Sequence, residues 1–278
     1  MAAPCQRSDR TRRVIAAAFI VHWRGVVRWA GDHQVEHDLI ISRALVEIFS
    51  DRALARALAF RGGTALHKLV FPAPLRYSDD IDLVQVAPGP IGDLMRVLRG
   101  RLDPILGASS FERSPISHTA VYRFRSEIPP TQPLRLKVEI NTREHFSVLG
   151  QQGRPFRVVS PWFTGEADVV TYQPDELCAT KLRALYQRSK GRDLFDLAMA
   201  LEREIVDPDA VVRCCLEYLK AGRRRVTKRQ FVTNLRAKIR RPAFRDDTVP
   251  LLPPGVTYDP DAAYERVMRA LIDRWPVT

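Results

Sequence analysis

Residues 76–83 read RYSDDIDL, and this stretch decides how the rest of the chain is interpreted. Asp79, Asp80 and Asp82 lie within four positions, directly ahead of an apolar run, although neighbouring carboxylates repel one another. The segment is either a solvated turn whose acids face water or the start of a strand that holds a cation. Side chains two residues apart on a strand point to the same face, so Asp80 and Asp82 would share a divalent cation, whereas Asp79 would point away.

A glycine pair lies upstream of the acidic stretch. The sequence predicts a short strand at 58–60, a turn at Gly62 and Gly63, and a helix at 64–71. Glycine lets the backbone approach a phosphate closely, and the N–H groups at the start of the next helix face that phosphate. A glycine pair alone is usually a turn, but the order strand, glycine pair, helix and acidic strand favours a site for a metal-bound nucleoside triphosphate.

The composition favours a polyanionic partner. The 278 residues carry 44 Lys and Arg against 32 Asp and Glu, which gives a net charge of +12 and a pI near 10.0. Nucleic acid is the partner that this excess of positive charge indicates. The four cysteines have no metal-ligand spacing and no apolar run approaches the ~20 residues of a membrane span, so we predict a cytoplasmic protein without a membrane partner.

Hydrophobic periodicity predicts two lobes. In residues 1–165, helical patterns such as 38–49 (behind an Asp38 cap) and 91–106 alternate with strand patterns such as 134–141, which is typical of an α/β or α+β lobe. Residues 166–278 are predicted to be a helical lobe, because apolar residues recur there at helical spacing.

The C-terminal lobe contains the most basic segment of the chain. Residues 220–241 carry ten Lys and Arg and no acid. Phe231 and Leu235 would seat a helix on the core and leave the cations outward, either as a solvated face or as a groove for a phosphate backbone; RNA binding is favoured. The predicted RNA-binding residues are Arg223, Arg224, Arg225, Lys228, Arg229, Arg236 and Lys238.

The motifs together resemble a known family. GGTALHK at 62–68 followed by RYSDDIDL is similar to the signature of the DNA polymerase β-like nucleotidyltransferases and, more narrowly, of the AbiEii/AbiGii family, which includes the MenT toxins of type IV toxin–antitoxin systems. Two further motifs of that family follow in order, KVEI at 137–140 and a helical K…R-x-K-x-R-D-x-x-D-L pattern at 181–197. The resemblance covers about half of the chain.

The resemblance implies a nucleotidyltransferase lobe with a small mixed sheet, a helical C-terminal lobe and an active site in the cleft between them. It implies that one or two Mg²⁺ ions bind Asp80 and Asp82, and that the enzyme transfers a nucleoside monophosphate from an NTP to the 3′ end of tRNA, which blocks growth. A cognate antitoxin is a further implied partner. The candidate catalytic residues are Asp80, Asp82, Lys181 and Asp196. The candidate nucleotide-binding residues are Gly62, Gly63, Thr64, Arg76, Ser78, Lys181, Lys190 and Asp193.

Several roles stay open at this point. Glu139 either completes a three-carboxylate metal site with Asp80 and Asp82 or pairs with an arginine on a neighbouring strand. Asp193 and Asp196 lie one helical turn apart and either hold Lys181, Lys190 or Arg192 in place or contact the nucleotide. Ser78 binds a phosphate, accepts a transferred group, or is a turn hydroxyl.

Other functions compete with transfer to tRNA. The sequence His33-Gln34-Val35-Glu36-His37 matches the H-x-x-E-H zinc-protease pattern, but no third ligand is evident downstream. The remaining alternatives are nucleotidyl transfer to a small molecule, transfer to a protein or to Ser78 of the chain itself, and a non-catalytic module that binds RNA or an antitoxin.

Overall fold

The computed structural model describes residues 14–276, so Cys5 and the last two residues lie outside it. The chain folds into two compact units that interleave along the sequence. Unit 1 comprises Met1–Phe60, Asp79–Phe146 and Gly153–Val170. Unit 2 comprises Arg61–Ser78, Ser147–Gln152 and Thr171–Thr278. Within the described residues, no helix is both long enough and apolar enough to cross a bilayer.

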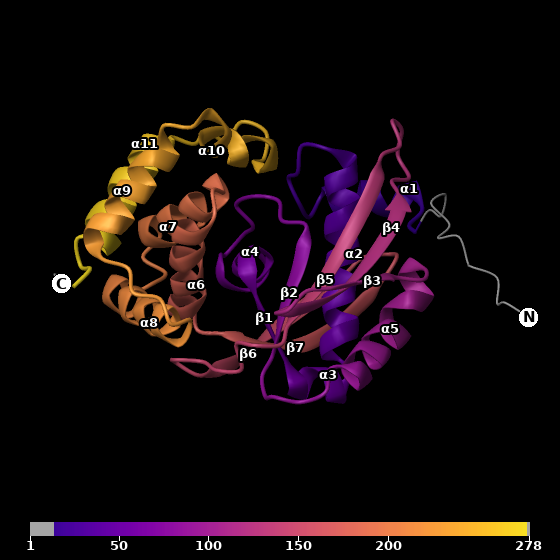
Figure 1. The fold of residues 1–278 in the computed structure, drawn as a ribbon. Helices are drawn as coiled ribbons and strands as arrows, with labels where there is room; N and C mark the ends of the chain where they lie inside the picture. Colours follow the sequence, from indigo (N-terminus) through magenta and orange to yellow (C-terminus); the bar gives the residue numbers. More distant parts are fainter. Residues whose placement is uncertain (1–13, 277–278) are drawn as a thin grey trace, which may run out of the picture. The chain divides into compact units, whose positions relative to one another are not determined.

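The strands form one mixed sheet of seven strands in the order β3-β4-β5-β2-β1-β7-β6 (Figure 1). β2 pairs with β5 in parallel, whereas β3 with β4 and β4 with β5 are antiparallel. The mixed α/β class is therefore confirmed. The strands are β1 (Leu58–Arg61), β2 (Asp80–Gln85), β3 (Ser110–Arg113), β4 (Ser117–Arg125), β5 (Pro133–Asn141), β6 (Gln151–Val159) and β7 (Thr164–Tyr172).

The alternation in the sequence of β5 sets which face of the sheet is buried. Leu136, Val138 and Ile140 are fully buried, because every second side chain of a strand points to the same face. In unit 1, helix α2 (Asp32–Phe49) packs on β2 and β5, and helix α5 (Gly92–Leu106) packs on β4 and α2. The polar side chains of β2 and β5 thus lie on the face opposite to the buried one.

Helix α2 begins earlier than the sequence predicted. It starts at Asp32, where the backbone N–H of Gly31 donates to the Gln34 side chain at 3.1 Å. Asp38, predicted to cap the helix, lies inside it, is 1% exposed and accepts a hydrogen bond from the indole of Trp23 at 2.9 Å. The Asp38 cap was wrong because an aspartate before an apolar run can equally be a buried acceptor for a neighbouring helix. The short helices of unit 1 are α1 (Ala17–Arg24) and α3 (Arg52–Ala57).

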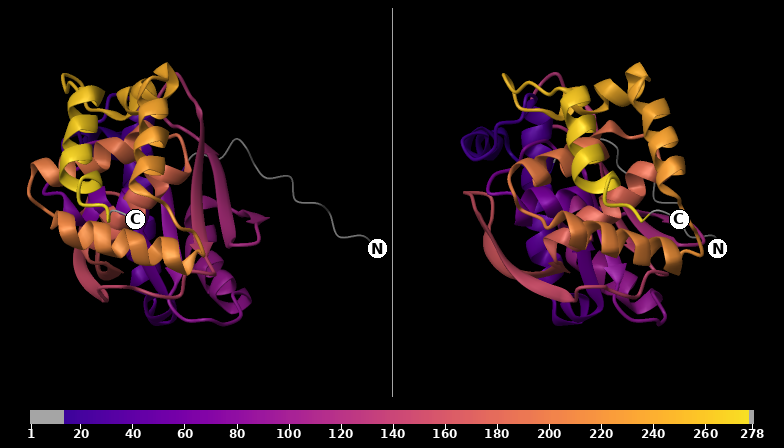
Figure 2. Two further views of the ribbon diagram at one scale, coloured as in Figure 1. Left: turned by 60° about the vertical axis from the view of Figure 1, so that its left-hand side comes forward. Right: turned by 90° about the vertical axis from the view of Figure 1, so that its left-hand side faces the viewer.

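Unit 2 is built mainly from helices, as the sequence predicted. Helix α6 contacts α7, α8 and α9, and α11 packs on α7 (Figure 2). A short N-terminal segment of the unit consists of α4 (Gly62–Ala65) and the π-helical η1 (Leu66–Val70). The other helices are α6 (Pro174–Gln187), α7 (Gly191–Glu202), α8 (Pro208–Ala221), α9 (Lys228–Ile239), α10 (Pro242–Arg245), η2 (Asp246–Leu251), α11 (Pro260–Val267) and η3 (Met268–Ile272).

Candidate functional site

Strand β2 of unit 1 presents two aspartates on one face. Asp80 and Asp82 are partly exposed, whereas Ile81 between them is fully buried. In the parallel register Asp82 lies opposite Glu139 of β5. Register partners project from the same side of a sheet, so Glu139 shares the face of the two aspartates. The acidic stretch is therefore a strand with one polar face.

This face fits a magnesium site made from two protein carboxylates. Mg²⁺ is usually held by one or two carboxylates, with the remaining oxygens supplied by water and substrate phosphates. Among residues 14–276, no three His, Cys, Asp or Glu side chains are grouped closely enough to hold a metal ion. Asp80 and Asp82 are hard oxygen donors, and two carboxylates are enough for a Mg²⁺ ion that takes its other ligands from water and phosphate. Glu139 as a third ligand stays a prediction.

Arg123 and Arg125 of β4, the neighbouring-strand arginines considered as partners of Glu139, have other partners. The Arg123 guanidinium lies 3.5 Å from Glu112, and Arg125 donates to Thr131 at 3.0 Å. Thr119 is the residue of β4 that lies opposite Glu139. Among the described residues, the cross-strand ion pair with one of these arginines is therefore not formed.

The glycine turn belongs to unit 2 and gathers three polar side chains. Gly62 has a φ of 85°, which favours glycine. A Cβ at Gly63 would lie 2.6 Å from Nη2 of Arg76 and 3.3 Å from both Nζ of Lys181 and Oγ of Ser78. Any side chain at Gly63 would therefore displace these groups. The turn thus brings a bare backbone, two cationic heads and a hydroxyl together.

The Ser78 hydroxyl is held beside this turn. Its Oγ lies 2.8 Å from Oγ1 of Thr64. Thr64 follows the glycines directly and is almost fully buried. The motif residues before and after η1 are therefore joined by a hydrogen bond.

Asp196 of α7 is the centre of a buried ionic network. Its two carboxylate oxygens accept from Nε and Nη2 of Arg76 at 2.8 and 2.7 Å. The ammonium of Lys181 lies 3.0 Å from the same carboxylate. Burial opposes ionisation of Asp196, but the charges of Arg76 and Lys181 outweigh it and hold its pKa well below the usual value. Asp196 is therefore a fully buried, ionised carboxylate.

His67 is a member of this network that the sequence reasoning missed. The backbone N–H of Leu75 donates to Nδ1 at 3.1 Å, so Nδ1 is an acceptor and Nε2 carries the proton that is donated to Asp196 at 3.0 Å. Burial and the neighbouring Arg76 lower the pKa of His67 to about 4, which keeps the ring neutral. The only indication in the sequence that His67 belongs to the site was its position inside the motif GGTALHK.

Asp193 holds Lys181 from the same helix face. Its Oδ1 lies 3.0 Å from Nζ of Lys181, and Arg188 donates to both carboxylate oxygens at 2.7 and 2.8 Å. Burial raises the pKa of Asp193, but Lys181 and Arg188 more than offset this and lower it overall. The sequence left open which cation Asp193 and Asp196 bind. In the structure both carboxylates form ion pairs with Lys181.

Lys190 and Arg192 are not held by these two aspartates. The Lys190 ammonium and the Arg192 guanidinium lie 3.7 and 3.9 Å from Asp247. Lys190 lies before the first residue of α7, and its side chain is about half exposed. Nucleotide binding by Lys190 stays a prediction.

The basic segment divides into outward and inward members. Five of the predicted RNA-binding residues are exposed, namely Arg223, Arg224, Arg225, Arg229 and Arg236. Lys228 is partly exposed and lies 3.0 Å from Asp273. The seating of α9 through Phe231 and Leu235, both fully buried, agrees with the sequence pattern.

Lys238 corrects the prediction that every cation of the segment faces outward. It is 6% exposed, and its ammonium donates to the carbonyls of Leu185 and Tyr186, the latter at 2.7 Å. These are among the last carbonyls of α6, which have no partner within their own helix and attract a cation through the helix dipole. Lys238 is therefore a cap for α6.

The H-x-x-E-H pattern is part of the core of unit 1. Glu36 is fully buried and accepts from the backbone N–H of Glu127 at 2.8 Å, and His37 packs against Phe124 with ring centroids 6.0 Å apart. The described residues contain no zinc-like cluster that includes His33 or His37. The zinc-protease interpretation is therefore not supported.

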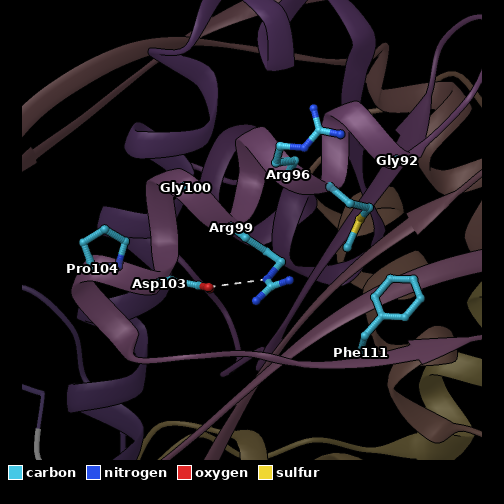
Figure 3. Close-up of a pocket in the computed structure, with 8 residues that line it drawn as sticks. Gly92, Arg96, Arg99, Gly100, Asp103, Pro104 and Phe111 are labelled. Atoms are coloured by element: carbon cyan, nitrogen blue, oxygen red, sulfur yellow. Dashed lines mark ion pairs between the residues drawn. The ribbon is translucent and has the colours of Figure 1, made fainter. Parts of the chain in front are cut away.

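A hollow of about 600 Å³ in unit 1 contains none of the predicted site residues (Figure 3). It lies along α5 and the exposed Phe111 of β3, and Arg99 forms an ion pair with Asp103 at 3.4 Å on its wall. Its size alone does not make it the site of the predicted chemistry.

Comparisons with known proteins give a family match and several similar solved structures. Residues 43–269 match the family described as "Nucleotidyl transferase AbiEii toxin, Type IV TA system". The fold is similar to that of MenT4, a nucleotidyltransferase toxin from Mycobacterium tuberculosis, with a TM-score of 0.61 and 18% identity over 94% of this chain and 90% of that one. It is also similar to JHP933 from Helicobacter pylori, with a TM-score of 0.50 and 17% identity over 86% and 91% of the two chains. No curated protein is significantly similar in sequence.

Proposed function

Because the chain belongs to the AbiEii family of type IV nucleotidyltransferase toxins, we propose that it transfers a nucleoside monophosphate from an NTP to the 3′ end of a tRNA. The product would no longer be aminoacylated, and growth would stop until a cognate antitoxin intervenes. The observation that carries the proposal is the convergence of Arg76, Lys181 and Ser78 on the backbone of Gly63.

The charge of this cluster suits a triphosphate. Three cations, Arg76, Lys181 and Arg188, face two carboxylates, Asp193 and Asp196, and His67 is neutral, so the cluster keeps one excess positive charge. The bare backbone at Gly63 lets an anionic oxygen come close to these cations. The excess charge would neutralise part of the bound triphosphate.

Lys181 is the residue that would touch a phosphate directly. An ammonium has three N–H bonds, and two of them are directed at Asp193 and Asp196 at 3.0 Å each. The third remains for a phosphate oxygen near Gly63. Arg76 is 2% exposed and has a bidentate bond to Asp196, so it supplies charge and rigidity rather than a free pair of donors.

Asp196 and Asp193 would act through Lys181 and are positioning residues in this proposal. Both are fully buried, and their oxygens already have cationic partners. Their ionised state fixes the ammonium at one place. Asp196 would therefore support the reaction without contacting the substrate.

Asp80 and Asp82 would hold Mg²⁺ on the polar face of β2. When bound, the metal would supply Lewis-acid stabilisation of the charge on the triphosphate. Asp80 follows Ser78 by two residues in the chain, so the metal-binding and phosphate-binding residues are joined by a single short stretch. Gly62, Gly63, Thr64, Arg76 and Ser78 would surround the phosphates.

The exposed arginines of the basic segment support a nucleic-acid acceptor. Five of them lie outward on or before α9, and contacts of this kind bind phosphate backbones regardless of sequence. A small-molecule acceptor would give them no role. Weakening of transfer by added salt is expected for a tRNA acceptor, because cations compete for the phosphates.

The test is to incubate the purified chain with total tRNA, Mg²⁺ and each labelled NTP in turn, and to separate RNA from protein before counting. We expect label on RNA with at least one NTP. The matched control is Asp80→Asn with Asp82→Asn, which should lower the label by about 10³-fold or more if the acidic pair holds the metal. Absence of label from RNA with all four NTPs would overturn the tRNA acceptor.

The protein fraction of the same reaction tests self-modification. Intact mass measurement would detect a nucleotidyl or phosphoryl group on the chain, and Ser78→Ala would show whether its hydroxyl is the acceptor. The proposal expects an unchanged protein mass. Label on the protein and none on RNA would replace the tRNA acceptor with the chain itself.

A further inference from the structure

Unit 2 contains a hollow of about 430 Å³ whose lining includes three of the exposed arginines of the basic segment. It lies where α8 ends, and the C-terminal Trp275 and Pro276 form one side of it. Pockets of roughly 300–1,000 Å³ are typical of sites for small ligands. The lining residues are Leu216, Leu219, Lys220, Arg223, Arg224, Arg225, Val226, Trp275 and Pro276.

The floor of the hollow is apolar and firmly held. The indole N–H of Trp275 donates to the carbonyl of Val226 at 2.8 Å, and its ring packs on Phe231 with centroids 5.2 Å apart. Leu219 and Trp275 are 3% and 2% exposed, so they form a fixed wall, whereas Leu216 is half-buried. The apolar surface that remains for a ligand is that of Leu216 and of the exposed Pro276.

The rim of the hollow is cationic. Arg223, Arg224 and Arg225 are exposed and form no ion pair with any residue in the described part of the chain. Lys220 lies 3.8 Å from Glu217 in a highly exposed pair, which contributes little. Among the described residues, the lining contains no acid. The rim therefore attracts anions, which the floor alone would not do.

Arg223 occupies a backbone position that favours glycine. Its φ is 53°, and the N–H groups of Arg223 and Arg224 donate to the carbonyls of Lys220 and Leu219 at 2.9 Å each, which ends α8. An L-residue in this left-handed region costs about 1 kcal/mol. The nearby glycine, Gly222, is the residue before Arg223 and has an ordinary negative φ of −77°, so it does not relieve this strain. The strained residue is the one that carries its guanidinium to the rim.

From these features we propose that the hollow binds one unpaired nucleotide of an RNA, with the base against the apolar floor and the adjoining phosphates on Arg223, Arg224 and Arg225. A base needs an apolar surface and its phosphates need cations, and the hollow offers both side by side. The identity of the RNA as acceptor rests on the proposed function. The hollow would make the chain prefer RNA with a single-stranded segment to a continuous duplex.

The first test compares a substitution that adds charge with one that does not. Leu216→Lys adds a positive charge but replaces an apolar side chain of the floor with a charged one. We expect it to weaken binding of a labelled single-stranded oligoribonucleotide by about fivefold or more. A purely electrostatic patch would instead bind as tightly or more tightly. Leu216→Gln gives the same test without a change in charge, should the lysine variant fold poorly.

The second test uses the strained position. Arg223→Gly removes one cation and relieves the backbone, so we expect weaker RNA binding, by about three- to tenfold, in a protein with a raised denaturation midpoint. Arg236→Ala, which removes an exposed cation outside the hollow, is the matched control and should weaken binding less. Unchanged affinity in Arg223→Gly would overturn the proposal.

The binding experiments are made without NTP on the Asp80→Asn, Asp82→Asn background, so they report on the hollow even if nucleotidyl transfer is absent. A blunt RNA duplex should bind more weakly than the single strand, and equal affinity would count against a base pocket. Mononucleotides, ribose 5-phosphate and inorganic phosphate are titrated in parallel. One outcome would overturn the proposal that the bound nucleotide belongs to an RNA. In that outcome the chain binds mononucleotides saturably, Leu216→Lys abolishes this binding, and the same variant leaves oligonucleotide binding unchanged, so the hollow would be a site for a free nucleotide.

Discussion

Two groups of carboxylates, each part of a motif of the family, differ in how deeply they are buried. In unit 2, Asp193 and Asp196 are fully buried and receive hydrogen bonds or ion pairs from protein cations. In unit 1, Asp80 and Asp82 are partly exposed on a strand face that also carries Glu139. The first group is neutralised by the chain itself, whereas the second is accessible from solvent.

The difference separates support from chemistry. A buried carboxylate with several cationic partners keeps a low pKa and a fixed position, but it has no oxygen to offer a substrate. Partly exposed carboxylates on one strand face leave room for a metal and its phosphates. The buried group should therefore matter for stability and the exposed pair for activity.

The largest effect is expected from Asp196→Asn. The change leaves Arg76 and Lys181 buried without their shared counter-charge, so the free energy of unfolding should fall by about 3–5 kcal/mol. Chemical denaturation at neutral pH measures this loss. Asp247→Asn is the matched control, because an Asn can still accept from the backbone N–H of Arg192 and the two cationic partners of Asp247 lie 3.7 and 3.9 Å away, so it should cost less than about 1 kcal/mol.

Equal losses in Asp196→Asn and Asp247→Asn would break the comparison. They would mean that the buried network contributes no more than the longer, partly exposed ion pairs of Asp247. Transfer activity measured on the folded fraction should also fall in Asp196→Asn, since Lys181 would lose one of its two anchors.

A second prediction concerns the pH dependence that the buried network imposes through His67. Its pKa falls from 6.5 to about 4 in the folded protein, because burial and Arg76 disfavour the charged ring. Between these values the unfolded chain takes up a proton that the folded chain does not, so the stability from this group is full above pH 6.5 and is lost as the pH falls towards 4. The loss is about 1.4 kcal/mol per pH unit at most, or roughly 3 kcal/mol in all.

His67→Gln removes that titration and keeps a donor for Asp196. The stability difference between wild type and the variant should therefore shrink as the pH is lowered from 6.5 to about 4, as measured by denaturant unfolding at several pH values. A difference that does not change over this range would show that His67 is not held neutral.

The sequence predicted the motif residues better than it predicted what surrounds them. GGTALHK contains Gly63, and the helical pattern at 181–197 contains Lys181 and Asp196. These positions could be singled out because glycine freedom and the spacing of charged residues are local properties of a sequence. The role of His67 depends on Asp196, which lies 129 residues away in the chain, and no local pattern shows such a contact. The network could therefore be outlined from sequence but its central histidine could not.

The limits of the fold prediction have similar causes. Period-two alternation identified β5, whose buried face repeats every second residue, whereas β6 and β7 are largely exposed or half-buried and their hairpin was not predicted. The grouping of Arg61–Ser78 with the helical unit also depends on distant parts of the chain rather than on local pattern. Burial against remote segments is the information that a single sequence does not contain.

Lys238 gives a prediction of intermediate size. Its ammonium bonds the last carbonyls of α6, the helix that carries Lys181, and burial lowers its pKa to about 8, so it is mostly charged at pH 7. Lys238→Met should lower the free energy of unfolding at pH 7 by about 1–2 kcal/mol. Arg236→Met, on the exposed side of α9, should leave stability within about 0.5 kcal/mol and weaken RNA binding instead. A reversed outcome would return Lys238 to the RNA-binding face.

The smallest change in stability is expected where the effect on activity is largest. Asp80→Asn with Asp82→Asn removes two neighbouring negative charges from a partly exposed strand face, so the free energy of unfolding in metal-free buffer should stay within about 0.5 kcal/mol of the wild type or rise slightly. Denaturation with and without added Mg²⁺ checks both halves of the comparison. Mg²⁺ should stabilise the wild type and not the double variant, because only an intact pair binds the ion in the folded state. A loss of stability as large as that of Asp196→Asn would show that the strand aspartates hold the fold together.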